Sequence, residues 1–121
     1  EMVSREALVQ AALKEITQNY REASLSNVAR AYGVSLAYVS ECVRAQTGRT
    51  YKELLQKHRM ETAARLLRRS DMNIQQIITL VGYENTSYFY RLFHDTAPAV
   101  PCFLAFRGVL RAAGARTGFF W

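Results

Sequence analysis

The chain has little of what most enzymes and metal proteins depend on. Its 121 residues include two cysteines, Cys42 and Cys102, and two histidines, His58 and His94. Neither cysteine has a partner at metal-binding spacing, so both are interpreted as small apolar residues in a reduced compartment, and no cofactor or metal is expected. Catalysis by histidine, cysteine or paired carboxylates needs converging groups, and there is no glycine-rich phosphate loop. The sequence therefore does not indicate an enzyme.

Long apolar runs are also missing. No stretch approaches 18 uncharged apolar residues and no signal peptide is present, so we expect no membrane segment and a cytoplasmic location. The apolar content of 50% is nevertheless ordinary for a globular chain. The chain opens Glu1-Met2, which indicates a fragment of a longer polypeptide or an expression scar.

Acidic side chains are in the minority, and the net charge is +6. The excess is concentrated in residues 25–69, which carry nine basic and three acidic side chains. A basic surface of this kind favours a polyanionic partner, although basicity alone is a weak signal.

One supersecondary pattern is present twice, and its later copy occupies residues 73–93. An amphipathic helix is predicted before Gly82, with a capping-box pattern formed by Asn73 and Gln76 at its start. Gly82 can adopt the left-handed conformation that ends a helix. A second helix is predicted after it, with Asn85 as its cap. The inward residues of this second helix are Phe89, Leu92 and Phe93, and the outward residues are Thr86, Ser87, Tyr90 and Arg91.

The earlier copy, residues 24–43, repeats this pattern 49 residues upstream: Ser24 corresponds to Asn73 and Gly33 to Gly82. Two short helices joined by a glycine-containing turn form a helix-turn-helix, whose second helix is suited to the DNA major groove. An internal repeat is a stronger signal than either copy alone. Two generic helical hairpins of a bundle are the alternative interpretation.

The second helix of the earlier copy is predicted from Leu36 to about Gln46, with Ser35 as its cap. Its outward residues are Leu36, Ala37, Ser40, Glu41 and Arg44. Glu41 is unusual in such a helix because a carboxylate repels phosphate. It can accept a hydrogen bond from cytosine N4, or it can pair with Arg44 one turn further on, and both interpretations stay open.

Three further helices complete the expected architecture. One is predicted from Ser4 to about Asn19, and a short one from Cys102 to Ala113. The longest, from Tyr51 to about Arg69, would span roughly 28 Å, close to the ~34 Å of one turn of B-DNA. The fold is expected to be all-α and homeodomain-like, with about seven helices and two helix-turn-helix subdomains joined by the long central helix. The expected parts are a first subdomain (1–50), a linker helix (51–69), a second subdomain (70–113) and an irregular tail (114–121).

An ordered set of motifs covers residues 25 to about 94: L-S-N-V-A with Y-G-V-S, then T-G-R-T-Y-K-E-L-L, S-D-M-N-I and V-G-Y-E-N-T-S-Y-F-Y-R-L-F. With these motifs the chain resembles the DNA-binding domain of AraC/XylS-type bacterial transcription regulators. The resemblance implies that two helices enter adjacent major-groove segments. By position, it implies groove contacts by Ala37, Ser40, Glu41, Thr86, Ser87 and Arg91. From Ala97 onward the resemblance fades.

The predicted function is sequence-specific binding of double-stranded DNA by one domain of a bacterial transcription regulator. RNA polymerase is a candidate further partner, and the resemblance implies a separate sensing or dimerisation domain elsewhere in the parent protein. The alternative is a helical protein-interaction module without DNA-binding activity, which would lack a steep salt dependence of duplex binding. The expected DNA-binding residues are Leu36, Ala37, Ser40, Glu41, Arg44, Asn85, Thr86, Ser87, Tyr90 and Arg91.

Overall fold

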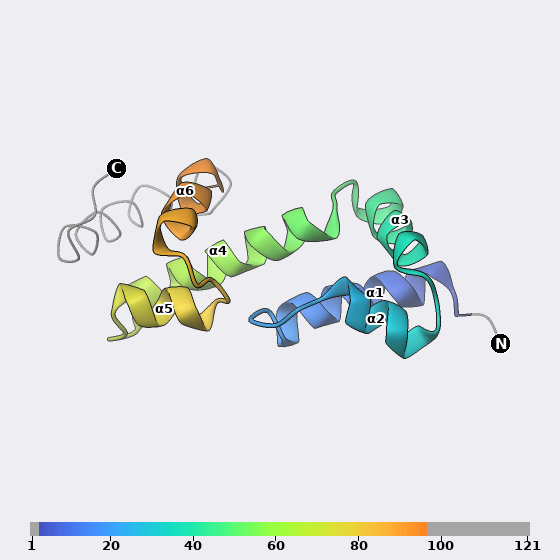
Figure 1. Cartoon of the computed structure of the whole chain (residues 1–121), viewed down its shortest axis with the longest axis horizontal. Coiled ribbons are helices and arrows are strands. Elements are labelled where there is room, and N and C mark those ends of the chain that lie inside the picture. The colour runs from blue at the N-terminus through green and yellow to red at the C-terminus, as the bar shows by residue number, and fades with distance from the viewer. Residues whose placement is uncertain (1–2, 97–121) are drawn as a thin grey trace. The chain divides into compact units, whose positions relative to one another are not determined.

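The computed structural model describes residues 3–96, which form six α-helices and no strands (Figure 1). This confirms the all-α expectation, while the closing helix expected over residues 102–113 and the tail lie outside the described residues. None of the described helices has the length and apolarity needed to cross a membrane. The helices are α1 (Arg5–Gln18), α2 (Leu25–Tyr32), α3 (Leu36–Thr47), α4 (Tyr51–Arg69), α5 (Ile74–Leu80) and α6 (Thr86–Thr96).

The chain divides into two compact units, one ending at His58 and the other beginning at Arg59, so the division falls within α4. In the first unit, the hydroxyl groups of Ser4, Ser24 and Ser35 each accept a backbone N–H bond at the start of α1, α2 and α3, at 3.1, 3.2 and 3.1 Å. These bonds satisfy amides that have no partner inside the helix. The structure thus confirms the caps predicted at Ser24 and Ser35.

Glycines end two helices of the first unit. Gly33 follows α2 with φ 65° and Gly48 follows α3 with φ 75°. A residue with a Cβ is strained in this left-handed conformation, so the turn between α2 and α3 depends on Gly33. The helix-turn-helix predicted for residues 24–43 is therefore present.

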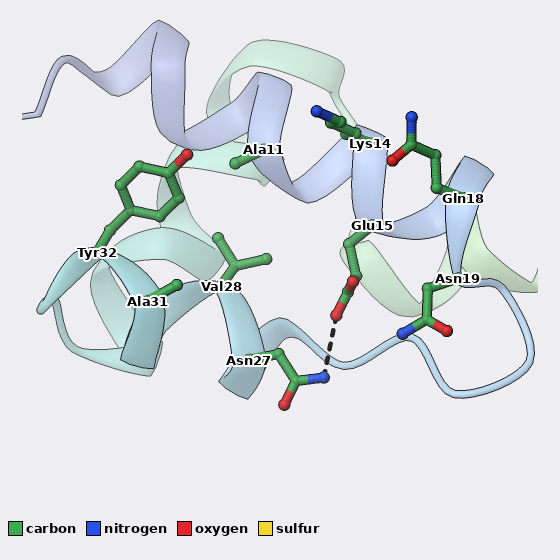
Figure 2. Close-up of a pocket in the computed structure, with 9 residues that line it drawn as sticks. All are labelled: Ala11, Lys14, Glu15, Gln18, Asn19, Asn27, Val28, Ala31 and Tyr32. Carbon is green, nitrogen blue, oxygen red and sulfur yellow. Dashed lines mark hydrogen bonds between the residues drawn. The ribbon is translucent and has the colours of Figure 1, made fainter.

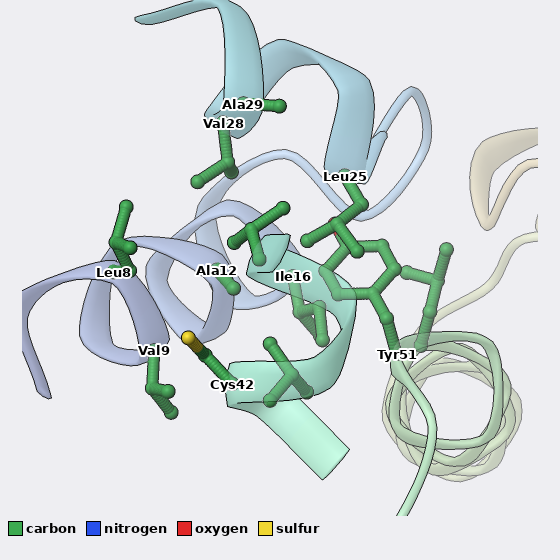
Figure 3. Close-up of a cluster of buried hydrophobic side chains, with 12 residues drawn as sticks. Leu8, Val9, Ala12, Ile16, Leu25, Val28, Ala29, Cys42 and Tyr51 are labelled. Carbon is green, nitrogen blue, oxygen red and sulfur yellow. The ribbon is translucent and has the colours of Figure 1, made fainter. Parts of the chain in front are cut away.

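The first unit has an apolar core to which α1, α2, α3 and the start of α4 contribute (Figure 3). From α3, Val39, Cys42 and Val43 are completely buried. One side of α3 therefore packs in the core, and the opposite side is exposed to solvent. The core residues are Leu8, Val9, Ala12, Ile16, Leu25, Val28, Ala29, Val39, Cys42, Val43, Tyr51 and Leu55.

The second unit contains the second helix-turn-helix, formed by α5 and α6. The capping box at Asn73 is complete: Asn73 Oδ1 accepts from the Gln76 amide at 2.9 Å, and Gln76 Oε1 accepts from the Asn73 amide at 3.0 Å. Gly82 has φ 102° and makes the turn. The Phe89 and Phe93 rings stack with centroids 6.4 Å apart. The buried apolar residues of this unit are Met60, Ala63, Ala64, Ile74, Ile77, Ile78, Val81, Tyr83, Phe89, Tyr90 and Phe93.

The helix α4 is unbroken over its 19 residues, which confirms the predicted long helix. Its start has a reciprocal cap that the sequence analysis did not identify. Thr50 donates its amide and its hydroxyl to Glu53 Oε1, both at 3.0 Å, and Thr50 Oγ1 accepts from the Glu53 amide at 3.2 Å. The two hydrogen bonds from Thr50 favour the carboxylate and lower the pKa of Glu53 below its usual 4.5, and desolvation opposes this effect without cancelling it.

Candidate nucleic-acid interface

The outward side of α3 carries the residues that the sequence predicts there. Because an α-helix turns about 100° per residue, burying Val39, Cys42 and Val43 turns the opposite arc toward solvent. All five predicted positions on this arc are exposed: Leu36, Ala37, Ser40, Glu41 and Arg44. We call these five residues the α3 face.

Charge is unevenly distributed along the α3 face. Leu36, Ala37, Ser40 and Glu41 occupy the first two turns, and the face's cation, Arg44, lies in the last turn. Leu36 is 50% exposed, a large fraction for an aliphatic side chain. Tyr38, which the sequence analysis did not select, is also exposed and lies beside this face. Its place at the flank of the outward arc is the signal that could have identified it.

A cation from another helix lies near one flank of α3. The exposed Arg5, at the start of α1, has its pKa raised by Cys42 and, to a smaller extent, by Tyr38 and Glu41. These three residues are spaced three and four apart and so occupy one flank of α3. Sequence reasoning could not place Arg5 there, because it lies more than thirty residues away along the chain.

The exposed side of α6 begins at its cap. Asn85 Oδ1 accepts the Tyr88 amide at 2.9 Å, which confirms the predicted cap. Thr86 is half-buried, and its hydroxyl donates to Gln75 Oε1 of α5 at 3.3 Å. Ser87 and Arg91 are exposed. Of the five residues predicted for this helix-turn-helix, these four are accessible, and we call Asn85, Thr86, Ser87 and Arg91 the α6 face.

The fifth residue, Tyr90, does not face outward as predicted. Its side chain is only 5% exposed, and its ring packs edge-on against Phe89 with centroids 5.8 Å apart. The buried arc of α6 is turned toward Tyr90 and away from Leu92, which is half-buried although it was expected to face inward. The prediction was wrong because helical spacing gives the relative angles of side chains but not the width or centre of the buried arc.

Aromatic residues before and within α6 form a cluster that the sequence analysis also missed. Tyr88 is 36% exposed, and its ring meets the buried Tyr83 edge-on at 6.0 Å. On Tyr83 lies the Arg59 guanidinium, 5.2 Å from the ring centroid, a favourable cation–π arrangement. Burial raises the pKa of Tyr83, and Arg59 partly opposes that rise. The contact with Tyr83 packs one side of the Tyr88 ring, and Tyr88 lies beside the α6 face.

A hollow of about 560 Å³ lies between α1 and α2 (Figure 2). Asn27 Nδ2 donates to Glu15 Oε2 at 3.0 Å across its rim. None of the predicted DNA-binding residues lines it. Within residues 3–96, no three histidine, cysteine or acidic side chains gather as a metal site would require. The lining residues are Ala11, Lys14, Glu15, Gln18, Asn19, Asn27, Val28, Ala31 and Tyr32.

Comparison with known proteins gives a consistent picture. Residues 28–101 match a family model described as a helix-turn-helix domain. The chain is 33% identical over 105 residues to the transcriptional activator NphR of Rhodococcus sp, an alignment covering 85% of this chain and 29% of that protein. It is 29% identical over 90 residues to the transcriptional activator PerA of Escherichia coli O127:H6, covering 72% of this chain and 30% of that protein.

A solved structure shows the same fold. The C-terminal domain of AraT, a response regulator from Geobacillus stearothermophilus, superposes with a TM-score of 0.68 at 32% identity, covering 73% of this chain and 74% of that chain. The chain spans about 30% of the length of the two activators above. The helix-turn-helix match covers more than half of the chain and includes most of both repeats. The chain therefore belongs to the AraC/XylS-type family of transcription regulators, as a DNA-binding domain of that family.

Proposed function

We propose that α3 and α6 enter adjacent major-groove segments of one duplex, and that their exposed faces recognise its sequence. The observation that carries this proposal is the pair of helix-turn-helix motifs, in which the second helix of each has one side buried and a polar side exposed. Recognition helices of this type contact base edges with residues near their N-termini. In this arrangement residues 1–50 and 70–113 are the two subdomains, and residues 51–69 connect them.

The proposed base contacts are the α3 face and the α6 face, with Tyr38 and Tyr88 beside them. Tyr90 is left out because its side chain is buried. Phosphate contacts would come from cations, since these position a protein on the duplex without reading its sequence. Exposed cations available on α4 are Lys52, Lys57, Arg65, Arg68 and Arg69.

This function needs no catalytic group, and we propose that the domain is not an enzyme. The described cysteine, Cys42, is completely buried, so its thiol is closed to a substrate. Because the proposed ligand is chromosomal DNA, we place the protein in the cytoplasm. For the whole regulator, we propose RNA polymerase as a partner and a separate domain for effector sensing or dimerisation, since the alignments cover only 29% and 30% of the activators that the chain resembles.

The salt dependence of duplex binding tests the proposal. A helix pair that neutralises several phosphates releases counterions, so log K should fall linearly with log salt with a slope of about −0.9 per phosphate contacted. Fluorescence anisotropy with a labelled duplex, obtained by selection from random DNA, measures this slope. A helical protein-interaction module would show no such binding, and that result would replace the proposal with the alternative.

Matched charge variants locate the interface. Arg44→Ala removes a cation from the α3 face, whereas Lys14→Ala removes an exposed cation beside the hollow between α1 and α2. We expect Arg44→Ala to weaken duplex binding and Lys14→Ala to leave it nearly unchanged. Equal losses would mean that only net charge matters and that the α3 face is not the binding surface.

A further inference from the structure

The first two turns of α3 lack every side chain that reads a purine by paired hydrogen bonds. Guanine is read by Arg or Lys at O6 and N7, and adenine by Asn or Gln at N6 and N7. The segment Leu36–Val43 contains none of these four residue types. Arg44 follows only in the last turn of the helix. If this helix reads bases with its N-terminal half, it must do so by another chemistry.

At its start this half of α3 offers apolar surface, and the exposed Ser40 and Glu41 follow one turn later. Leu36 is the first residue of the helix and is 50% exposed, and Ala37 beside it is exposed as well. Among the large hydrophobic residues of the described chain that are exposed, Leu36 is the only aliphatic one. Isolated exposed leucines are common on protein surfaces. This one lies at the N-terminal end of a recognition helix, the part that such helices bring to base edges.

A cation of another helix lies beside the other flank of α3. Arg5 of α1 is near Tyr38, Glu41 and Cys42. Leu36 and Ser40, four residues apart, share the opposite flank. Leu36 therefore lies on the flank of α3 away from Arg5, next to Ala37 and one turn before the hydroxyl of Ser40.

We propose that α3 recognises thymine through its 5-methyl group, with Leu36 and Ala37 packed against that methyl in the major groove. The thymine methyl is the apolar group that base edges present in this groove, and it is contacted by apolar side chains. This inference rests on the proposed function and specifies what α3 reads. The half-site facing α3 would then prefer thymine, while the half-site facing α6 would prefer guanine through Arg91.

Deoxyuridine substitution tests the methyl contact directly, because it removes only the methyl group and keeps the pairing. The probe is the duplex selected from random DNA, with its thymines replaced one at a time by deoxyuridine. We expect each methyl that is contacted to contribute about fourfold to affinity, and thymines elsewhere to contribute nothing. Replacing a guanine with 7-deazaguanine, which lacks the N7 acceptor, should weaken binding only at positions in the other half-site.

Variants of Leu36 assign the effect to this residue. In Leu36→Ser the fourfold deoxyuridine effect should disappear at one thymine, whereas in Leu36→Met, which keeps an apolar side chain, it should persist. Tyr32→Ser changes a residue of similar exposure on α2 and should leave the deoxyuridine effect intact. Circular dichroism of each variant checks that the fold is retained.

The outcomes separate this inference from the function on which it rests. Absence of salt-dependent binding to any duplex would refute both. Selective binding in which no thymine is preferred overturns the inference alone, as does a deoxyuridine effect that is unchanged in Leu36→Ser. Loss of the effect at one thymine, only when Leu36 becomes polar, supports it.

Discussion

Two neighbouring residues of α6 have opposite environments. Tyr90 is buried against Phe89, and Arg91, one residue further, is exposed. A rotation of about 100° per residue separates their side chains, so the edge of the buried arc passes between them. Arg91 is thereby left exposed on the outward side of α6, with the bidentate donor group that pairs with guanine O6 and N7 in protein–DNA complexes.

Arg91→Ala tests whether this residue reads a base or only positions the protein. We expect a loss of about 1–3 kcal/mol in binding free energy, with relaxed preference at one position of the site. Affinities for a selected duplex and its single-base variants measure both effects. Arg65→Ala on α4 is the control, and it should weaken binding to all sequences alike or not at all. A uniform loss with Arg91→Ala would show a phosphate contact instead.

At the scale of elements, the helices of this chain depend on side-chain caps. Four helices have a side-chain oxygen that accepts a hydrogen bond from a backbone amide of the first turn; these caps are Ser4, Ser24, Ser35 and Asn85. The short α5 has the complete capping box at Asn73. With only 7 residues, α5 is too short to be stable on its own. Its cap and its packing against α6 therefore hold it in place.

Asn73→Ala should destabilise the domain by about 1 kcal/mol. The Gln76 amide loses its acceptor, and the reciprocal hydrogen bond from the Asn73 amide to the Gln76 side chain loses the contact that supports it. That loss of stability corresponds to a decrease in Tm of roughly 4 °C for a chain of this length. Thermal unfolding followed by circular dichroism measures it. Thr79→Ala, at an exposed position of the same helix, is the matched control and should have little effect. An unchanged Tm for Asn73→Ala would show that the cap is dispensable.

The cap of α4 predicts a pH dependence of stability. Folding lowers the pKa of Glu53 below 4.5, mainly through the hydrogen bonds from Thr50. A lowered carboxyl pKa stabilises the fold above the unfolded pKa, and this contribution is lost as the pH falls through the folded pKa. The Tm advantage of the native protein over Glu53→Gln should thus be largest near neutral pH and shrink below about pH 4.5. A difference in Tm between the native protein and Glu53→Gln that stays constant from pH 7 to pH 3 would contradict this prediction.

At the scale of the whole molecule, each compact unit packs the second helix of one helix-turn-helix on its own apolar core. In the first unit α3 is anchored by Val39, Cys42 and Val43, and in the second α6 is anchored by Phe89 and Phe93. Each core buries one side of its helix and leaves the other side exposed to solvent. Two separate cores on one chain are compatible with the proposal that a monomer contacts two groove segments.

The footprint of the domain tests this arrangement. We expect a monomer to protect a site of roughly 16–20 base pairs, with two protected major-groove segments about one turn apart. Footprinting at several protein concentrations, with the stoichiometry determined by analytical ultracentrifugation, provides the measurement. Protection of a single segment would mean that only one helix-turn-helix binds.

The sequence by itself determined the helices, their order and most of their ends. Caps at Ser24, Ser35 and Asn73 and the turn at Gly33 depend on residues within a few positions of one another, so local spacing is sufficient to predict them. The cap between Thr50 and Glu53 is equally local, and its T-x-x-E spacing could have been recognised. The same periodicity correctly placed the α3 face and most of the α6 face.

Only the tertiary structure decided how far each helix is buried and what lies beside it. Tyr90 is inside because the neighbouring aromatic rings widen the buried arc of α6. Arg5 reaches the flank of α3, and Arg59 lies on Tyr83, because packing brings together residues distant in sequence. Helical spacing fixes the angle between two side chains of one helix, but the surroundings of that helix come from other segments. For that reason the sequence could predict which side of each helix is exposed, but not the burial of every residue on it.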